Sequence, residues 1–133
     1  MGRNYYRRGG RLVVKRKGIT QRRSRPVFSR KRENGYRTPL RGIQMKTLAH
    51  GEKTLLAEFK LSRGSVLPAH SHPHEQTGYL VSGKINLTIG GRTHAADPGD
   101  SWCIPPDVEH GAEALADSVA VEVFSPVRED YLP

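Results

Sequence analysis

The sequence lacks the features that secreted and membrane proteins usually carry. Its 133 residues include one cysteine, Cys103, so a disulfide within the chain is excluded and a disulfide-stabilised secreted fold is not expected. No stretch approaches the roughly 20 apolar residues that cross a bilayer, and the basic N-terminus has no apolar segment of the kind found in signal peptides. We therefore expect a cytoplasmic protein that does not associate with a membrane.

Apolar residues are also scarce, and the charge distribution explains why. They make up 35% of the chain, and the mean hydropathy is −0.62. Residues 1–41 contain 15 Lys and Arg and one acid, Glu33, and therefore carry a net charge of +14. Residues 42–133 contain 7 Lys and Arg and 12 acids, for a net charge of −5. The overall charge of +9 thus describes a basic tail attached to a mildly acidic domain.

Residues 1–38 predict a disordered tail. Their only apolar cluster is LVV at 12–14, and like charges at this density oppose collapse. Three interpretations stay open: binding to nucleic acid or another acidic surface by counterion release, a solvated tail without a partner, or a segment upstream of the true translation start. The segment contains no helix-turn-helix, zinc-binding or RNA-recognition motif. Nucleic acid is therefore not expected as a partner of the domain, and only the charge of the tail could bind it.

Residues 39–133 predict one domain of short antiparallel strands. Runs such as LLAEFKL (55–61), KINLTI (84–89) and SVAVEVF (118–124) are separated by glycine-containing turn signals. In the second run aliphatic side chains alternate with polar ones, as in a half-buried strand. In the third run valines alternate with Ala120, Glu122 and Phe124. No helical pattern exceeds one turn, and no internal repeat is present. This pattern favours a single all-β barrel or sandwich.

Three of the six histidines stand at alternate positions, His70, His72 and His74. Side chains at i and i+2 of a strand point to the same face, about 6.5–7 Å apart along the strand, and strand twist lets two such imidazoles converge on one ion. Gln76 has the same parity and offers an amide oxygen, and His110 follows another strand and can close the site. Imidazole suits zinc, copper, iron and nickel, whereas an amide oxygen is a weaker, harder ligand.

Two segments around these residues resemble the two motifs of the cupin family. GSVLPAHSHPHEQTGYLVSG (64–83) is similar to the first motif, whose positions fall on Gly64, His70, His72, Gln76 and Gly83. DPGDSWCIPPDVEHG (97–111) is similar to the second motif, whose positions fall on Pro98, Gly99, Pro105 and His110. The resemblance covers about residues 40–133. It implies a small antiparallel β-barrel of the jelly-roll type with a divalent metal ion inside.

The ligands that this resemblance implies are His70, His72, Gln76 and His110. Many cupins have Glu at the position of Gln76, but the neighbouring Glu75 breaks both the parity and the spacing of the motif. Four neutral ligands leave the ion its full charge, which favours Lewis-acid action on an anionic substrate. They leave the metal open among nickel, zinc, iron and manganese. The plain alternative is a surface cluster of histidines.

The end of the chain narrows the resemblance. HSHPHEQTGYLVSG (70–83), GDSWCIPPDVEHG (99–111) and VEVFSPVREDYL (121–132) together resemble the KdgF-type cupins of pectin and alginate breakdown. Those proteins convert 4,5-unsaturated monouronates into linear keto-uronates. The family has an acid, a phenylalanine and an arginine on and after the last strand. This pattern is matched by Glu122, Phe124 and Arg128, although the family's acid is Asp.

The roles that the resemblance implies fit the chemistry of a small anionic sugar acid. Arg128 would grip the carboxylate with its two-donor fork. Glu122 would shuttle a proton if a closed barrel raises its pKa, and Phe124 would pack against the sugar and exclude water. In plainer interpretations, Arg128 pairs with Glu129 or Asp130, and Phe124 belongs to the core.

Three functions stay open at this stage. The first is a metal-assisted uronate-processing enzyme, the second an iron or manganese dioxygenase, and the third a non-catalytic sugar-binding cupin. The dioxygenase requires oxygen and a redox-active metal, whereas the uronate-processing enzyme requires neither. The binding protein would bind its ligand without turnover and would tolerate replacement of Glu122. The family resemblance also implies a homodimer. Trp102 and Cys103, on a predicted strand, are interpreted as core or dimer-contact residues.

Overall fold

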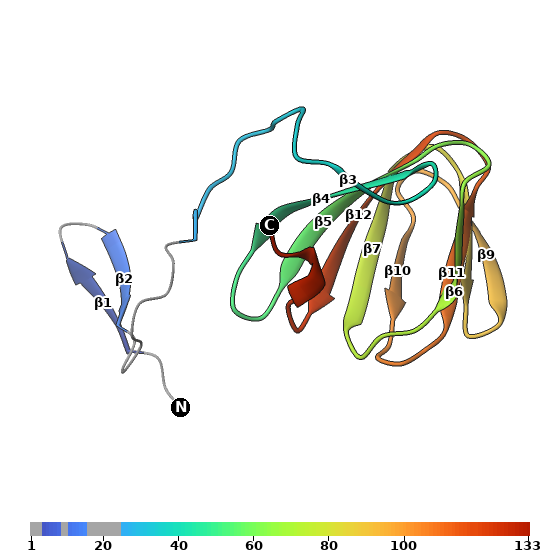
Figure 1. Cartoon of the computed structure of the whole chain (residues 1–133). Coiled ribbons are helices and arrows are strands. Elements are labelled where there is room, and N and C mark those ends of the chain that lie inside the picture. Colours follow the sequence, from blue (N-terminus) through green and yellow to red (C-terminus); the bar gives the residue numbers. More distant parts are fainter. Residues whose placement is uncertain (1–3, 9–10, 16–24) are drawn as a thin grey trace.

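The protein is built almost entirely of β-strands (Figure 1). The computed structural model describes residues 4–8, 11–15 and 25–133. The barrel strands are β3 (Arg37–Leu40), β4 (Ile43–His50), β5 (Leu55–Leu61), β6 (Val66–His70), β7 (Glu75–Ser82), β8 (Ile85–Ile89), β9 (Arg92–Ala96), β10 (Ser101–Ile104), β11 (His110–Ala114) and β12 (Ser118–Ser125). A short 3-10 helix, η1 (Glu129–Tyr131), follows. The all-β prediction is confirmed, and no helix in the described part of the chain is long and apolar enough to span a membrane.

Two antiparallel sheets face each other and enclose the core. One has six strands in the order β10-β7-β12-β5-β4-β3, and the other has four in the order β6-β11-β8-β9. From β5 onward the chain passes repeatedly between the two sheets, which is the connectivity of a jelly roll (Figure 1). Residues that are distant in the sequence, such as those at the starts of β7 and β11, are thereby brought to one cavity.

The alternation predicted for the last strand is confirmed. In β12, Ala120, Glu122 and Phe124 are buried, whereas the three valines between and before them are only half-buried. Side chains at i and i+2 of a strand point in one direction. One face of β12 can therefore contribute both to the core and to a cavity beside it. The chain therefore presents an acid and an aromatic ring to the barrel interior from a single strand.

Gly83, the last position of the first motif, is required by its backbone. It lies in the turn between β7 and β8 with φ of 89°, a conformation that L side chains rarely adopt. A Cβ at this position would also collide with the carbonyl oxygen of Asp117 and with Ser118. Gly83 thus permits close packing of two turns at one end of the barrel, and its role is structural.

The segment that was predicted to be a disordered tail contains one paired element. β1 (Asn4–Arg8) and β2 (Arg11–Lys15) form an antiparallel two-stranded sheet, which the sequence analysis did not predict. The tyrosines, leucine and valines in these stretches favour strands, although the charge density and scarce apolar surface of the whole segment predict disorder. The remaining residues of the segment up to 24 lie outside the described residues.

The described chain also contacts the barrel before the predicted domain start at residue 39. Lys46 Nζ donates a hydrogen bond to the backbone oxygen of Arg32 (2.6 Å), and the Tyr36 hydroxyl donates one to Glu58. β3 itself begins at Arg37. Residues 32–38 therefore belong structurally to the barrel, because their backbone and side chains bond to β4 and β5.

Candidate metal centre

Three histidines come together where β6 ends and β11 begins. His70 is the last residue of β6 and His110 the first of β11, and the two pair across the sheet. The ring centroids lie 4.3 Å apart for His70 and His110, 4.8 Å for His72 and His110, and 5.8 Å for His70 and His72. One ligand atom from each ring lies within 4.8 Å of the others. The three imidazoles are thus grouped closely enough to bind one metal ion.

The convergence arises differently from the strand parity expected from the sequence. Because β6 ends at His70, His72 lies beyond the strand, in the loop that leads to β7. The chain turns at this loop and brings the ring of His72 back toward His110. Gln76, by contrast, does lie on a strand, β7, and its side chain is buried.

All three rings are oriented by backbone carbonyls. Nδ1 of His70 lies 2.8 Å from the oxygen of Pro68, and Nδ1 of His110 lies 2.9 Å from that of Val108. Nδ1 of His72 lies 3.0 Å from the oxygen of its neighbour His74. A carbonyl only accepts, so each Nδ1 carries the proton and each Nε2 keeps its lone pair for a ligand. Nε2 of His110 is buried and has no hydrogen-bond partner among the described residues.

The fourth candidate ligand faces the same point. Oε1 of Gln76 lies 3.0 Å from Nε2 of His72, and the amide nitrogen of Gln76 donates to Glu122. This donation fixes which end of the amide is the oxygen. Two acceptors, the lone pair of His72 Nε2 and the oxygen of Gln76, then face each other. A cation that both atoms contact resolves this repulsion, so the donor set fits a divalent metal.

Burial keeps the imidazoles of His72 and His110 in their ligating form. Loss of solvation, followed by the charge of Arg128, lowers the pKa of His72. Burial likewise lowers the pKa of His110, with smaller contributions from the neighbouring histidines and Arg128. A neutral imidazole is the form that binds metal, so both residues are in that form at neutral pH.

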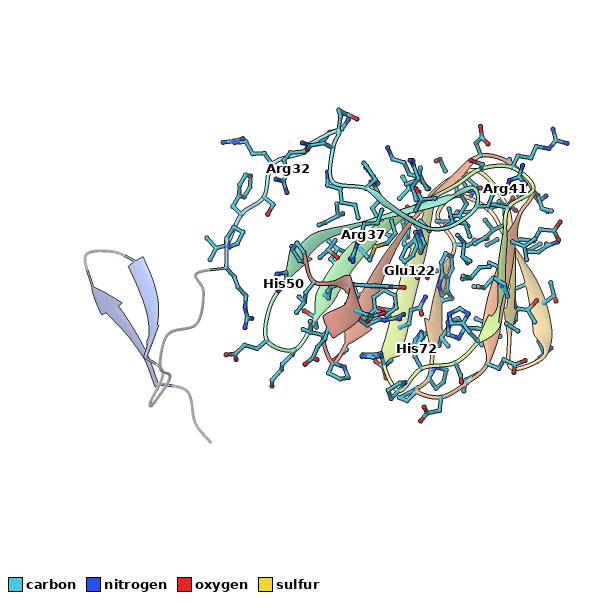
Figure 2. All side chains as sticks on the ribbon, viewed as in Figure 1. Arg32, Arg37, Arg41, His50, His72 and Glu122 are labelled. Atoms are coloured by element: carbon cyan, nitrogen blue, oxygen red, sulfur yellow. The ribbon has the colours of Figure 1, made fainter. Side chains whose placement is uncertain are left out.

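Glu122 lies in the space between the sheets (Figure 2) and is bonded to the amide of Gln76. It is 9% exposed, and its carboxylate accepts hydrogen bonds from Trp102 Nε1 (3.0 Å) and from the Gln76 amide. Burial raises the pKa of Glu122 to about 7, although both hydrogen bonds act in the opposite direction. A carboxyl with a pKa in this range can both take up and release a proton near neutral pH.

A glycine on β7 makes the contact between Trp102 and Glu122 possible. Gly78 pairs with Trp102 of β10 on one side and with Glu122 of β12 on the other. The indole lies over Gly78, where an added Cβ would collide with the ring nitrogen and the adjacent carbons. Because Gly78 has no side chain, the indole reaches across this strand to the carboxylate.

The candidate residues surround one cavity between the sheets. Space for the centres of water-sized molecules amounts to about 100 Å³, several times the roughly 10–15 Å³ that one water requires. Aliphatic and aromatic side chains from both sheets form most of its wall. Six of the seven candidate residues line it: His70, Gln76, His110, Glu122, Phe124 and Arg128. The cavity suits a small ligand with polar groups at one end.

Phe124 and Arg128 line the cavity and also make the contacts of their plainer interpretations. Phe124 is 1% exposed and belongs to a core cluster, yet it lines the cavity and its ring centroid lies 5.9 Å from that of His72. Arg128 lines the cavity and also forms an ion pair with Asp130, with Nη2 2.7 Å from the carboxylate. The guanidinium is therefore present at the cavity but is already bonded on one side.

Comparison with known proteins places these motifs. A family model described as the cupin domain matches residues 57–126, more than half of the chain. The chain belongs to the cupin family. Both predicted motifs and all four candidate ligands of this cupin fall inside the matched region.

Two solved structures and one curated protein are similar to this cupin. KdgF from Halomonas sp. is 36% identical, with 75% of this chain and 93% of that chain covered and a TM-score of 0.72. An RmlC-like cupin from Shewanella frigidimarina is 26% identical, with 80% and 96% covered and a TM-score of 0.77. The H2HPP isomerase of Bacillus subtilis is 28% identical over 83 residues, 62% of this chain. The chain spans 35% of the length of that curated relative. The predicted resemblance to KdgF-type cupins is confirmed.

Two residues at this cupin's cavity were not predicted as site residues. Trp102 was interpreted as a core or dimer-contact residue, but it lines the cavity and donates to Glu122. Tyr131 also lines the cavity, with its ring centroid 5.3 Å from that of Phe124. The glycine opposite Trp102 was a possible signal for the first. No signal in the sequence pointed to Tyr131, because it reaches the cavity only through the fold of the C-terminal turn.

Proposed function

We propose that this cupin is a metal-dependent enzyme that converts 4,5-unsaturated monouronates into linear keto-uronates. The observation that carries the proposal is the environment of Glu122, a buried carboxyl that lines the cavity, bonds to the amide of Gln76 and has a pKa of about 7. The 36% identity with KdgF of Halomonas over three quarters of the chain supports it. The name of the Bacillus relative, an isomerase, agrees with a reaction that rearranges bonds without net oxidation.

The metal would be held by His70, His72, His110 and the amide oxygen of Gln76. When bound, a divalent ion at this place supplies Lewis-acid polarisation of a substrate oxygen. A neutral ligand set suits an anionic substrate, because no ligand charge opposes it.

The protein's own residues would provide the proton transfers. Opening of the cyclic hemiacetal breaks the bond between C1 and the ring oxygen, transfers the proton of the C1 hydroxyl to that oxygen, and leaves an aldehyde at C1 and an enol at C5. The enol becomes a ketone when C4 gains a proton and the enol oxygen loses one. A single carboxyl that accepts one proton and returns another balances these steps, and Glu122 is the buried acid in the cavity. Its pKa near 7 makes both directions accessible at neutral pH.

Phe124 and Arg128 would hold the substrate in place. The Phe124 ring forms an apolar wall beside the ring of His72, and excludes water from the reacting carbons. Arg128 offers a planar fork to the C6 carboxylate. The family's acid is Asp where this chain has Glu122, so the carboxyl reaches one methylene further; here that reach ends in the bonds to Trp102 and Gln76.

The test follows the ultraviolet absorbance of the 4,5-unsaturated uronate made by a pectin or alginate lyase. We expect the metal-loaded protein to remove this absorbance faster than spontaneous decay, and we expect chelation or His110→Ala to abolish the acceleration. A Glu122→Gln variant should retain metal but lose most of the rate, about 100-fold or more for loss of a proton-transfer group. No acceleration by the loaded protein would refute the proposal, and a rate that depends on oxygen would point to a dioxygenase instead.

A further inference from the structure

The C-terminal turn forms one wall of the cavity. After β12 the chain turns back beside β4 and forms η1 there (red in Figure 1). Arg128 and Tyr131 from this turn both line the cavity. These residues lie outside the segment matched by the cupin family model, 57–126. The part of the cavity that would meet a substrate carboxylate thus lies beyond the matched cupin segment.

Arg128 is held in a fixed plane. Its guanidinium carbon lies 4.0 Å from the ring centroid of Tyr131 and 5.2 Å from that of Phe124. Nε and Nη2 donate to the two carboxylate oxygens of Asp130, at 3.2 and 2.7 Å. A guanidinium has two edges that can each bind a carboxylate in this two-bond manner. Asp130 occupies one edge, and in the part of the chain that the structure describes Nη1, on the other edge, has no hydrogen-bond partner.

The backbone of the turn at Asp130 is held by strands of the large sheet. Arg37, the first residue of β3, donates from Nη1 to the backbone oxygen of Asp130 (3.1 Å). Thr47 of β4 donates to the backbone oxygen of Tyr131. Two strands of the large sheet thereby anchor the backbone of the turn. The side chain of Asp130 is 58% exposed, whereas that of Arg128 is 15% exposed, so the acid approaches the guanidinium from the solvent side.

We propose that Asp130 is a positioning residue that orients Arg128 so that its second guanidinium edge serves as the carboxylate receptor of the cavity. This inference rests on the proposed function and deepens it by assigning specificity for sugar acids to the C-terminal turn. The cost is a weaker long-range attraction for anions, because Asp130 neutralises the charge of Arg128. The gain is preorganisation, since a guanidinium that is stacked and paired loses little freedom when it binds.

The alternative role for Asp130 predicts the opposite result. If Asp130 competed with the substrate for Arg128, its removal would free the guanidinium and strengthen the binding of anions. If Asp130 orients Arg128, its removal lets the guanidinium rotate and weakens binding. The sign of the change in KM therefore decides between the two roles.

The first measurement compares Asp130→Ala, Asp130→Glu and the matched control Glu129→Ala as metal-loaded proteins. Glu129→Ala removes the same charge one residue away without touching Arg128. For the unsaturated uronate we expect Asp130→Ala to raise KM about tenfold with kcat changed less than about twofold, Asp130→Glu to restore part of the loss, and Glu129→Ala to match the wild type. An unchanged or lower KM in Asp130→Ala overturns the inference while uronate turnover by the wild type leaves the proposed function standing.

The second measurement is independent of turnover. Calorimetric binding of galacturonate, which is not consumed, is compared with that of galactose, which lacks the carboxylate. We expect the wild type to prefer galacturonate and Asp130→Ala to lose about tenfold of that preference. If galacturonate shows this behaviour but no unsaturated uronate is converted, the proposed function fails and the receptor stands. If galacturonate and galactose bind the wild type equally, the receptor inference is overturned.

Discussion

Each histidine of the candidate centre uses one ring nitrogen for the fold and leaves the other for a ligand. His110 is the most enclosed, because it is 2% exposed and its Nε2 has no partner among the described residues. We expect His110→Ala to weaken metal binding by at least about 100-fold. Loss of a residue that only hydrogen-bonds to a metal ligand already costs up to about 100-fold, and His110 is proposed to be a ligand itself. Metal content after dialysis against a competing chelator measures this. His94→Ala removes an exposed histidine on β9 as the control, and equal metal content in both variants would contradict the assignment.

The raised pKa of Glu122 also predicts how stability depends on pH. The folded state binds the proton with a pKa of about 7, against 4.5 for an ordinary Glu. This group's stabilising contribution is therefore fully present below pH 4.5 and is lost as the pH rises through about 7. The loss is on the order of 3 kcal/mol. In metal-free protein, urea unfolding should show that the free energy of unfolding of Glu122→Gln rises relative to that of the wild type by about this amount between pH 4.5 and neutral pH.

The subtraction of the two variants isolates Glu122. His72 and His110, whose lowered pKa values favour the folded state as the pH rises, contribute equally to both proteins. Parallel unfolding profiles for wild type and Glu122→Gln would show that the carboxyl titrates normally and would weaken its proposed role in proton transfer.

At the level of secondary structure elements, three strands meet at Gly78. β10, β7 and β12 place Trp102, Gly78 and Glu122 side by side in the sheet. Gly78→Ala should push the indole away from the carboxylate, because the added Cβ would overlap the ring. We expect a loss of about 1–3 kcal/mol of stability, as for other overpacked sites, and a lower rate of uronate turnover. Urea denaturation gives the first value and the absorbance assay the second.

Gly51→Ala is the matched control for this substitution. Nothing lies within 4 Å of a Cβ built at Gly51, and its φ lies outside the left-handed region. Its stability should stay within about 0.5 kcal/mol of the wild type. Equal effects of the two substitutions would mean that the loss comes from the backbone preference of glycine and not from the contact with Trp102.

The sequence predicted strands better than it predicted contacts between strands. The alternation in β12 identified the buried face that holds Glu122 and Phe124, because period two depends only on local geometry. The parity argument for His72 was wrong in its reason, since β6 ends before it. Trp102 was not predicted as a site residue because its role depends on its bond to Glu122, which lies two strands away in the sheet. Register between strands depends on packing of the whole sheet, which one run of residues does not encode.

At the scale of the whole molecule, the segment that carries the net charge is not the segment that stabilises the barrel. Residues 1–24 contain nine Lys and Arg and no acid, so they account for the whole net charge of +9 and residues 25–133 are balanced. The contacts that stabilise the barrel begin later, at Arg32, Tyr36 and Arg37. The N-terminal boundary that matters for stability therefore lies between residues 25 and 42.

Two shortened chains test this boundary. A chain that begins at Arg25 keeps every contact described for the barrel, so we expect its melting temperature to stay within about 2 °C of that of the full chain. A chain that begins at Gly42 loses β3, the bond from Lys46 to Arg32 and the bond from Arg37 to Asp130. Loss of several hydrogen bonds and an edge strand should lower its stability by on the order of 3 kcal/mol.

The shorter chain should also lose substrate affinity, because Arg37 anchors the turn that carries Asp130 and Arg128. We expect KM for the uronate to rise in the chain that begins at Gly42 and to stay unchanged in the chain that begins at Arg25. Thermal melts and the absorbance assay on metal-loaded proteins measure both effects. A chain from Gly42 that melts and binds like the full protein would show that β3 is dispensable.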